Sequence, residues 1–401
     1  MIEKLRVRNF RCLRDVEVPL GPLNFLIGPN NTGKSSFLEA IEVLSRCMRV
    51  DYVAYAFQQL GLRLERSLTQ PGEGRLLEYG ADVTWATSSA PGRRAHYELA
   101  IRPNPAVPTN PHESVLIERE AVGLADGQGS ALASFTRTGA GHPQSMVTYP
   151  GGNTETLQLS GVHSTIPHSM QKRGDARLAA LVGTLRSTPK YSLVPQRVAE
   201  PCQLVEQAEL LPDGFGLASC LDNLHNSDPG RFAKIEDALR LFVPGVEMVR
   251  FPPAGPGQKT ILFHEKTGAK VYASEASHGL LLFLAHLTVA YAHGDVGVVL
   301  IEEPENAVHP RRLRDIVHLL RAICRGELGL PPVQVIATSH SPFLLNWCSK
   351  EEVTLFLRDE AGEVRTTPLA AIPGIDERIE DFASLGEFIY TVGEQACASR
   401  S

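Results

Sequence analysis

The feature that most constrains this chain is the stretch GPNNTGKS at residues 28–35, which matches the pattern GxxxxGK[ST] without a mismatch. It follows the apolar run Leu23–Ile27 and opens a stretch with helical patterning from Lys34 to Met48. In such a strand–loop–helix setting the glycines let the backbone curl, so that its N–H groups face phosphate oxygens, and the helix start adds positive potential. The pattern predicts a phosphate-binding loop, the alternative being a chance match.

Two residues of this loop have chemically distinct roles. Lys34 is expected to bridge the β- and γ-phosphates of a nucleotide, and the hydroxyl of Ser35 is expected to ligate Mg²⁺. The loop therefore predicts a nucleotide and Mg²⁺ as cofactors.

A second candidate is the stretch VVLIEEPE at residues 298–305, in which apolar residues are followed by carboxylates. A buried parallel strand delivers its C-terminal residues to the crevice where ligands bind in open α/β sheets. Glu302 is expected to reach the Mg²⁺ shell, and Glu303 to orient and polarise the attacking water as a general base. An exposed acidic turn is the alternative. Asp is commoner than Glu at position 302, and the extra methylene is expected to weaken magnesium binding.

Three shorter elements accompany these. His340 ends the next apolar strand, where it could contact the γ-phosphate, although a lone His is usually structural. Asn306–Pro310 follows the acidic strand and could be merely a helix N-terminal turn with Pro at the first position. Ser277 and Gly279 open a long apolar helix, Leu280–Ala292, where they could bind an anion or simply cap the helix.

Composition and charge restrict the class of protein and the cellular compartment. The chain has 401 residues and a net charge of −6, so a nucleic-acid module that works by sheer positive charge is disfavoured, although a local basic groove is not. No stretch is apolar enough to span a bilayer, and the N-terminus carries charges where a signal peptide needs an apolar run. The cysteines are scattered and odd in number, which favours reduced thiols and a cytoplasmic location.

The order of elements predicts an α/β fold. Strands are expected at residues 2–8 and 15–20, an antiparallel meander within 78–160, and a hairpin from Thr260–Phe263 and Ala269–Ala273. Asp175–Arg186, Gly216–Leu224, Arg231–Phe242 and Pro310–Arg325 are expected helices, and Val296–Ile301, Val333–Thr338 and Val353–Leu357 expected strands. Alternating strands and helices imply a mostly parallel sheet. We expect one ATPase head formed by residues 1–75 and 256–401, with a β-rich and helical insertion at 76–255.

The order of these motifs resembles that of ABC-type ATPases of the RecF, SMC and OLD (overcoming lysogenization defect) branch. More closely, the chain resembles ATPases with the AAA_21-type ABC domain. The resemblance is carried by NFRCLRDVEVPLGPLNFLIGPNNTGKSSFLEAI, SHGLLLFLAHL, LIEEPENAVHP and IATSHSPFLL, and in the middle of the chain by LLPDGFGLASCLDNL.

The resemblance implies a role for each matching position. Glu302 and Glu303 would form Walker B with the catalytic Glu, Asn306 to His309 the D-loop, and His340 the switch His. Ser277 and Gly279 stand where the ABC signature contacts ATP across a dimer. Walker A would comprise Gly28, Pro29, Asn30, Asn31, Thr32, Gly33, Lys34, Ser35 and Ser36.

The chain departs from the family pattern in two places. His278 occupies a signature position where an acidic residue is frequent, and the string LSGGQ is absent. The Q-loop Gln cannot be assigned among Gln58, Gln59 and Gln70. The stretch after His340 is shorter than the nuclease domain of OLD proteins, and no sustained heptads predict SMC arms.

The resemblance implies a homodimer that sandwiches ATP and acts with a separate effector, such as a nuclease or toxin, in DNA repair or phage defence. A non-hydrolysing ATP-bound scaffold is the main alternative, and a transporter subunit a weaker one. Five arginines could form a basic surface that contacts DNA, but side chains on solvated helix faces explain them better. They are Arg11, Arg14, Arg311, Arg312 and Arg314.

Overall fold

The structure is a computed structural model that describes residues 1–70, 75–87, 90–106, 110–139, 144–205, 208–291, 297–380, 382 and 384–392. The chain forms two compact units. Unit 1 comprises Met1–Gly21, Gly28–Thr188 and Thr354–Ala371, and unit 2 comprises Pro22–Ile27, Pro189–Val353 and Ile372–Ser401. Both units therefore draw on both ends of the chain. The domain boundaries expected near residues 75 and 255 stay a prediction.

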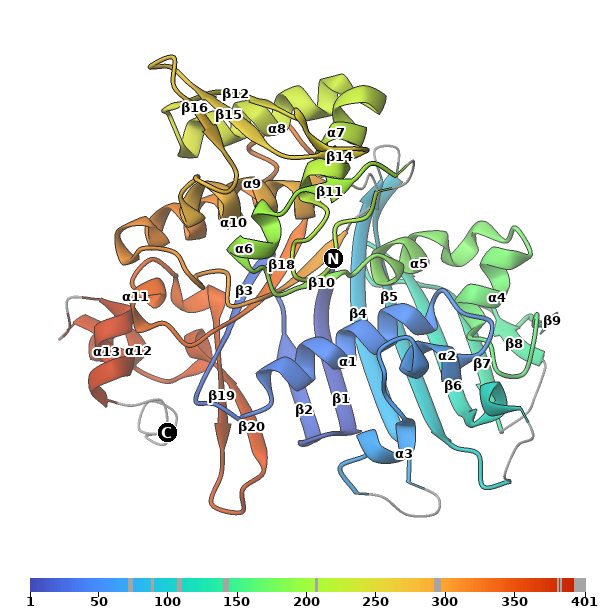
Figure 1. Cartoon of the computed structure of the whole chain (residues 1–401). Coiled ribbons are helices and arrows are strands. Elements are labelled where there is room, and N and C mark those ends of the chain that lie inside the picture. Colours follow the sequence, from blue (N-terminus) through green and yellow to red (C-terminus); the bar gives the residue numbers. More distant parts are fainter. Residues whose placement is uncertain are drawn as a thin grey trace. The chain divides into compact units, whose positions relative to one another are not determined.

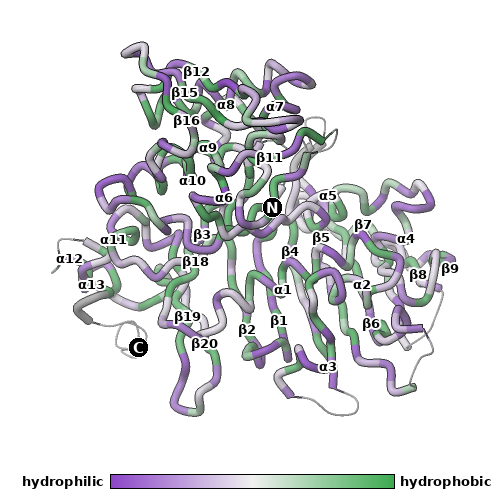
Figure 2. The backbone as a smooth tube through the Cα atoms, in the orientation of Figure 1, coloured by the Kyte–Doolittle hydropathy of each residue, from purple (hydrophilic) through white to green (hydrophobic). Residues whose placement is uncertain are grey.

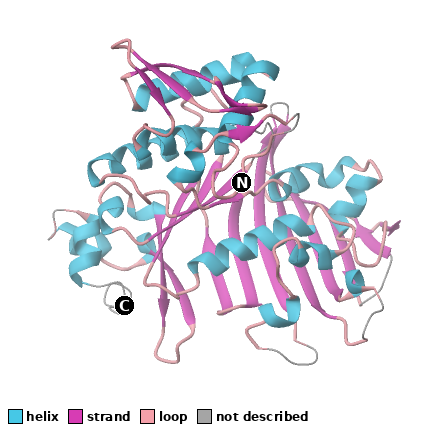
Figure 3. Ribbon diagram, viewed as in Figure 1, coloured by secondary structure: helices cyan, strands magenta, loops and turns pink. Residues whose placement is uncertain are grey.

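Unit 1 is built on an eight-stranded antiparallel sheet with the order β2-β1-β4-β5-β6-β7-β8-β9 (Figures 1 and 3). Its strands are β1 (Ile2–Phe10), β2 (Leu13–Pro19), β4 (Leu77–Thr87), β5 (Ala90–Pro103), β6 (Val115–Asp126), β7 (Ala131–Thr138), β8 (Gln144–Thr148) and β9 (Thr154–Gln158). The meander expected within residues 78–160 is thus confirmed. It continues into the two N-terminal strands, β1 and β2.

Five helices of unit 1 lie over one face of this sheet (Figure 1). They are α1 (Lys34–Cys47), α2 (Val53–Gln58), α3 (Leu64–Ser67), α4 (Ile166–Lys172) and α5 (Ala179–Arg186). The sheet alternates accordingly: in β1, Leu5 and Val7 are buried while Arg6 and Arg8 are exposed. Because successive strand side chains point to opposite faces, the helices cover an apolar face and a charged face is left on the other side. The hairpin of β19 (Val353–Arg358) and β20 (Val364–Pro368) also falls in unit 1, apart from Val353.

Unit 2 contains the parallel strands, in the order β10-β17-β18-β3. These are β10 (Lys190–Tyr191), β17 (Val298–Glu302), β18 (Gln334–Ser339) and β3 (Leu23–Ile27). Helices α9 (His278–Tyr291) and α10 (Leu313–Arg325) pack against one another, and α10 also packs on β18 and β3. From Leu280 to Tyr291 every residue of α9 is buried, whereas α10 alternates apolar and charged residues (Figure 2).

The remainder of unit 2 consists of further helices and two small sheets. Its helices are α6 (Pro195–Ala199), α7 (Leu217–Ser227), α8 (Pro229–Phe242), α11 (Pro342–Leu345), α12 (Ile375–Glu380) and α13 (Leu385–Val392). Two small antiparallel sheets comprise β11 (Cys202–Gln203), β13 (Pro253–Gly255) and β14 (Gln258–Lys259), and β12 (Val246–Arg250), β15 (Leu262–Glu265) and β16 (Lys270–Tyr272). The expected hairpin near residue 266 is confirmed as β15 and β16.

The α/β fold class is confirmed, with one correction. The strands around the phosphate loop are mixed, because β19 and β20 pair antiparallel whereas β10, β17, β18 and β3 pair in parallel. The helix expected over Asp175–Arg186 begins as a 3₁₀ turn at Ala176–Leu178, where the Asp175 side chain accepts from Arg177 N. Ala292 and Val296, the expected ends of a helix and a strand, lie outside the described residues. In the described part of the chain, no helix has the length and apolar character needed to cross a membrane.

Candidate functional site

The phosphate loop follows β3 directly in the chain and ends where α1 begins at Lys34. Gly28 and Gly33 adopt φ angles of 152° and 94°. A Cβ atom at Gly28 would lie 2.0 Å from the carbonyl oxygen of Phe356, and one at Gly33 would lie 2.8 Å from a methyl group of Leu13. Both positions therefore exclude a side chain through their backbone angles and through their neighbours. These constraints explain why the motif has glycine at both positions.

The start of α1 is left open to an anion. Gly33 is its N-cap, no side chain caps it, and its first turn has no acidic residue. The first N–H groups of a helix lack intrahelical partners and carry partial positive charge. Asn30, Asn31 and Ser35 are exposed, whereas Thr32 is buried and donates through its hydroxyl to Pro29 O at 2.9 Å.

Lys34 lies folded onto the loop that precedes it. Its side-chain Nζ donates to Gly28 O at 2.6 Å and to Pro29 O at 2.7 Å, and the residue is only 4% exposed. The ammonium group is therefore satisfied by carbonyl oxygens of the loop itself. A phosphate group would exchange these neutral acceptors for an anionic one, which is the stronger partner for a charged donor.

The acidic strand end and the switch position come together in unit 2. Because β17 and β18 are parallel neighbours with Glu302 opposite Thr338, their carboxyl ends meet at one edge of the sheet. Glu303 follows with a left-handed φ of 48°, and its N–H donates to Thr338 O at 3.0 Å. This backbone turn places the Glu303 carboxylate 3.7 Å from Nε2 of His340.

Glu302 has a different environment. Its carboxylate lies 3.7 Å from Nζ of Lys190, the residue that pairs with Leu300 across β10 and β17. Both side chains are about one-fifth exposed. The carboxylate oxygen is the hard donor that Mg²⁺ prefers, but here an ammonium group competes for it. Sequence patterns did not predict this pairing, because Lys190 is far from Glu302 in the chain.

Glu305 is a residue of this edge that sequence reasoning left without a role. Its Oε1 accepts from Ser339 Oγ and from the N–H of His340, at 2.5 and 3.3 Å, while Oε2 is buried with no partner among the described residues. Burial raises the pKa of this carboxyl group. Glu305 thus ties the turn after β17 to the backbone that carries His340. The signal in the sequence was the third acidic residue of EEPE.

At the D-loop and signature positions, His309 and Ser277 each cap the start of a helical turn. His309 Nδ1 accepts from Arg311 N at 3.2 Å, so His309 caps the 3₁₀ turn Pro310–Arg312. Ser277 Oγ accepts from Leu280 N at 3.3 Å and so caps the start of α9. Around Gly279 a Cβ atom would meet open space. Both caps leave Ser277 and His309 exposed. Contact with ATP across a dimer stays a prediction for these positions.

The Q-loop candidates have ordinary contacts. Gln58 donates to Pro111 O, Gln59 accepts from Arg46, and the backbone N–H of Gln70 donates to Asn9. None of these contacts distinguishes one of the three glutamines.

The arginines considered for DNA contact mostly have partners. Arg11 pairs with Glu39 and Arg14 with Glu363, both within unit 1. In unit 2, Arg312 pairs with Asp315, and Arg314 lies over the ring of Trp347. Such pairing reduces the positive charge that these side chains offer to phosphates, which favours the reading as solvated surface.

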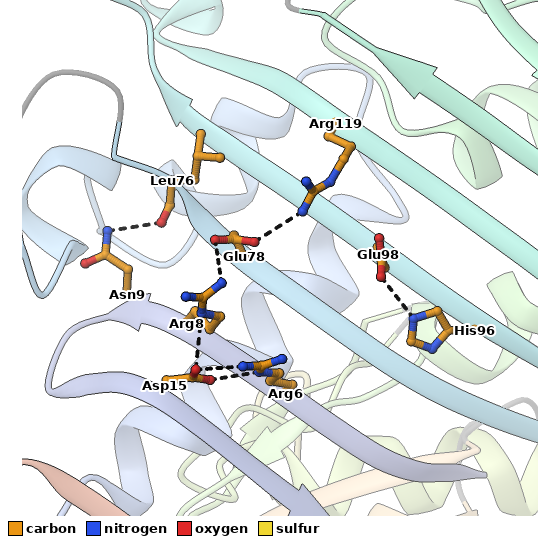
Figure 4. Close-up of polar contacts among 9 residues, drawn as sticks. All are labelled: Arg6, Arg8, Asn9, Asp15, Leu76, Glu78, His96, Glu98 and Arg119. Atoms are coloured by element: carbon orange, nitrogen blue, oxygen red, sulfur yellow. Dashed lines mark hydrogen bonds and ion pairs between the residues drawn. The ribbon is translucent and has the colours of Figure 1, made fainter.

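The charged face of the unit 1 sheet is likewise neutralised (Figure 4). Asp15, Arg8 and Glu78 lie opposite one another on β2, β1 and β4, and Arg119 of β6 reaches Glu78 across Ala100. A shallow hollow of about 330 Å³ over these strands is lined by both signs of charge. Alternating ion pairs across neighbouring strands stabilise a sheet surface and weaken the field that its arginines offer to an anion.

Comparisons with known proteins bear on both halves of this site. Residues 1–58 match the family model AAA_15, described as an AAA ATPase domain. Residues 204–346 match AAA_21, described as "AAA domain, putative AbiEii toxin, Type IV TA system". These segments contain the phosphate loop and the acidic strand end with the switch position. Both segments are similar to ATPase domains. The resemblance that the motifs predicted is confirmed.

One curated relative and two solved structures are also similar to this chain. The chain is 50% identical over 44 residues to an OLD nuclease of Thermus scotoductus, a match that covers 11% of this chain and 8% of the nuclease. An SMC head bound to the C-winged helix domain of ScpA covers 91% of this chain and 96% of its own, with 13% identity and a TM-score of 0.49. The SMC head domain of Thermotoga maritima covers 92% and 98%, with 10% identity and a TM-score of 0.41. Likeness at this level carries no inference about function.

Proposed function

We propose that the chain binds ATP with Mg²⁺ and hydrolyses it, with the phosphate loop binding the nucleotide and the acidic strand end supplying groups for hydrolysis. The observation that carries this proposal is the uncapped start of α1 behind two glycines that cannot accept a side chain. The ATPase family models matched at both segments support it.

The donor set fits the cofactors. Ser35 is exposed and offers a hydroxyl oxygen, and Glu302 offers a carboxylate oxygen; each is the kind of donor that a hard cation such as Mg²⁺ prefers. When bound, this ion would neutralise charge on the phosphates. The backbone N–H groups of the loop and the ammonium group of Lys34 would bind the β- and γ-phosphates. These residues supply binding and orientation, which account for most of catalysis in phosphoryl transfer.

Glu303 and His340 are the groups proposed for the chemical step. The Glu303 carboxylate would accept a proton from the attacking water, as its exposure allows. His340, 3.7 Å away, would orient that carboxylate and contact the γ-phosphate. Glu303 and His340 both belong to unit 2.

The first test is ATP turnover by the full chain with Mg²⁺, compared with Lys34→Ala and Glu303→Gln. Turnover that depends on both residues is the expected result. Wild-type protein that neither binds nor hydrolyses ATP would contradict the proposal.

We further propose that two copies associate around ATP and that the dimer acts with a separate effector in a DNA-related process. The motif resemblance motivates this, and the exposure of Ser277 and His309 permits it. Light scattering with and without ATP tests the dimer, using Glu303→Gln to retain the nucleotide. DNA binding is tested by affinity at rising salt, because phosphate contacts weaken steeply with salt. An ATP-independent monomer would contradict the dimer.

A non-hydrolysing scaffold is favoured by one observation, the Lys190–Glu302 ion pair at 3.7 Å, which competes with Mg²⁺. The Glu303→Gln variant separates the two functions. An ATPase loses turnover, whereas a scaffold binds ATP and behaves as the wild type does.

A further inference from the structure

The phosphate loop is backed by a hairpin that belongs to none of the sequence motifs. β19 and β20 pair from Thr354 opposite Pro368 to Arg358 opposite Val364. The turn between them is stabilised by Asp359, whose Oδ1 accepts from the N–H groups of Ala361 and Glu363 at 3.0 and 2.8 Å. The hairpin therefore has a defined turn and does not depend on the loop for its shape.

Within unit 1, this hairpin approaches the loop at three positions, Gly28, Asn31 and Gly33. The carbonyl oxygen of Phe356 occupies the space where Gly28 would carry a side chain, and a Val364 methyl group lies 3.4 Å from the corresponding position at Gly33. The ring of Phe356 packs edge-on against Phe37 of α1, with ring centroids 5.7 Å apart. The hairpin thus forms the rear wall of the loop and of the first turn of α1.

Arg358 makes the polar contact between the two. Its Nε and one terminal nitrogen donate to the carbonyl oxygen of Asn31 at 2.9 and 2.7 Å. Its other terminal nitrogen donates to Gly362 O in the hairpin turn. The guanidinium group therefore joins the loop to the hairpin through carbonyl oxygens, in the fork geometry that Arg favours.

Arg358 holds a backbone turn at Asn31. Asn31 has a left-handed φ of 65°, a conformation that Asn adopts more readily than most residues with a Cβ atom. Asn31 is exposed, so packing does not hold it in place. A charged bidentate donor on its carbonyl oxygen stabilises this conformation and fixes the direction of that oxygen.

Arg358 also differs electrostatically from the arginines around it. Arg14 pairs with Glu363, and Arg365 with Asp359. Among the described residues Arg358 forms no ion pair, so its positive charge beside the loop is not cancelled by a carboxylate. A cation whose partners are neutral carbonyl groups adds favourable potential for an anion nearby.

We propose that Arg358 is a positioning residue of the phosphate loop, which sets the affinity for the triphosphate by holding the Asn31 carbonyl and by adding an uncompensated positive charge. This inference rests on the proposed function, because it presumes that the loop binds ATP. Arg358 contacts no reacting atom, so it affects binding and leaves the chemical step unchanged.

The experiment compares Arg358→Gln and Arg358→Lys with Arg365→Gln as the matched control, since Arg365 lies on the same hairpin and bonds only carboxylates. Binding of a fluorescent ATP analogue with Mg²⁺ is measured by titration, and KM and kcat are measured separately. We expect Arg358→Gln to raise the Kd and KM about tenfold, because a charge-assisted pair of hydrogen bonds is lost. Arg358→Lys should restore part of the affinity through its charge, and kcat at saturation should stay within about twofold.

The outcomes are distinguishable. Wild-type protein that does not bind the analogue would overturn the proposed function and this inference with it. Wild-type binding with an unchanged Kd in Arg358→Gln would overturn this inference alone, as would an equal loss in Arg365→Gln. Thermal unfolding reports folding of each variant. If Arg358→Gln fails to fold, the Kd of Arg358→Lys tests the inference instead. Lys keeps the charge but cannot make the bidentate contact, so a Kd equal to that of the wild type would contradict the inference.

Discussion

The two halves of the candidate site reach their geometry by different means. The phosphate loop depends on missing side chains, because Gly28 and Gly33 have neighbours where a Cβ atom would be. The acidic strand end depends on side chains that are present, because Glu305 ties the turn after β17 to the backbone of His340. Substitution should therefore disrupt the first half by adding atoms and the second half by removing them.

The largest effect is expected for Gly28→Ala. The added Cβ atom would lie 2.0 Å from Phe356 O, which is a backbone atom that cannot rotate away. We expect loss of measurable ATP binding and a decrease in the free energy of unfolding of about 3 kcal/mol or more. Binding titration and denaturant unfolding measure the two effects. Gly183→Ala in α5 is the control, because a Cβ atom there meets open space. Wild-type affinity in Gly28→Ala would show that the loop tolerates added atoms.

Glu303→Gln tests the chemistry of the other half with little change of shape. The amide cannot accept a proton from water, so turnover should fall by about 10² or more while ATP binding is retained. The Glu303 backbone keeps its bond to Thr338 O in this variant. Steady-state phosphate release and a binding titration check the prediction, with Glu351→Gln as an exposed acidic control. A parallel loss of binding would indicate that Glu303 acts in holding the nucleotide.

Glu305→Ala removes the tie between the two strand ends. Ser339, which is buried, would lose the acceptor of its Oγ, and His340 the acceptor of its N–H, which costs about 1–3 kcal/mol in the free energy of unfolding. Denaturant unfolding at fixed pH measures this, and Glu351→Ala is the surface control. If Glu305→Ala unfolds as the wild type does, the acidic half does not depend on that side chain.

The smallest effect is expected on the charged face of the unit 1 sheet, away from both halves. The hydrogen bonds from Arg6 lower the pKa of the Asp15 carboxyl group below its usual value (Figure 4). Because the folded-state pKa is lowered, the stabilisation is complete above the unfolded pKa of about 3.9 and is lost as the pH falls through the folded value.

Asp15→Asn should thus destabilise the protein at pH 7 by less than about 1 kcal/mol, since Asp15 is 39% exposed and solvent screens the pair. Denaturant unfolding from pH 7 to pH 2 should show the difference from the wild type shrinking towards acid, with ATP affinity unchanged. A difference that grows towards acid would contradict the assigned sign.

Local patterns predicted most of the elements and failed where distant segments meet. The GxxxxGK[ST] match located the start of α1, and the apolar run before Glu302 located β17. The sheet partners of β1 and β2 were not predictable, because an alternating strand pattern does not reveal which strand lies beside it. Arg358 and Lys190 were missed for the same reason. Each contacts a motif far away in sequence, and no spacing rule connects them.

By itself the sequence determined the chemical groups of this protein: a glycine-rich loop before a helix, carboxylates after a buried strand, and a His after the next strand. These follow from local rules of backbone freedom and strand burial. Only the tertiary structure decided which groups are engaged. It folded Lys34 onto its own loop, set Lys190 beside Glu302, and placed Arg358 on Asn31. Such contacts depend on how distant segments pack, because the energy of a charged group is set by the partners that packing brings within a few ångströms.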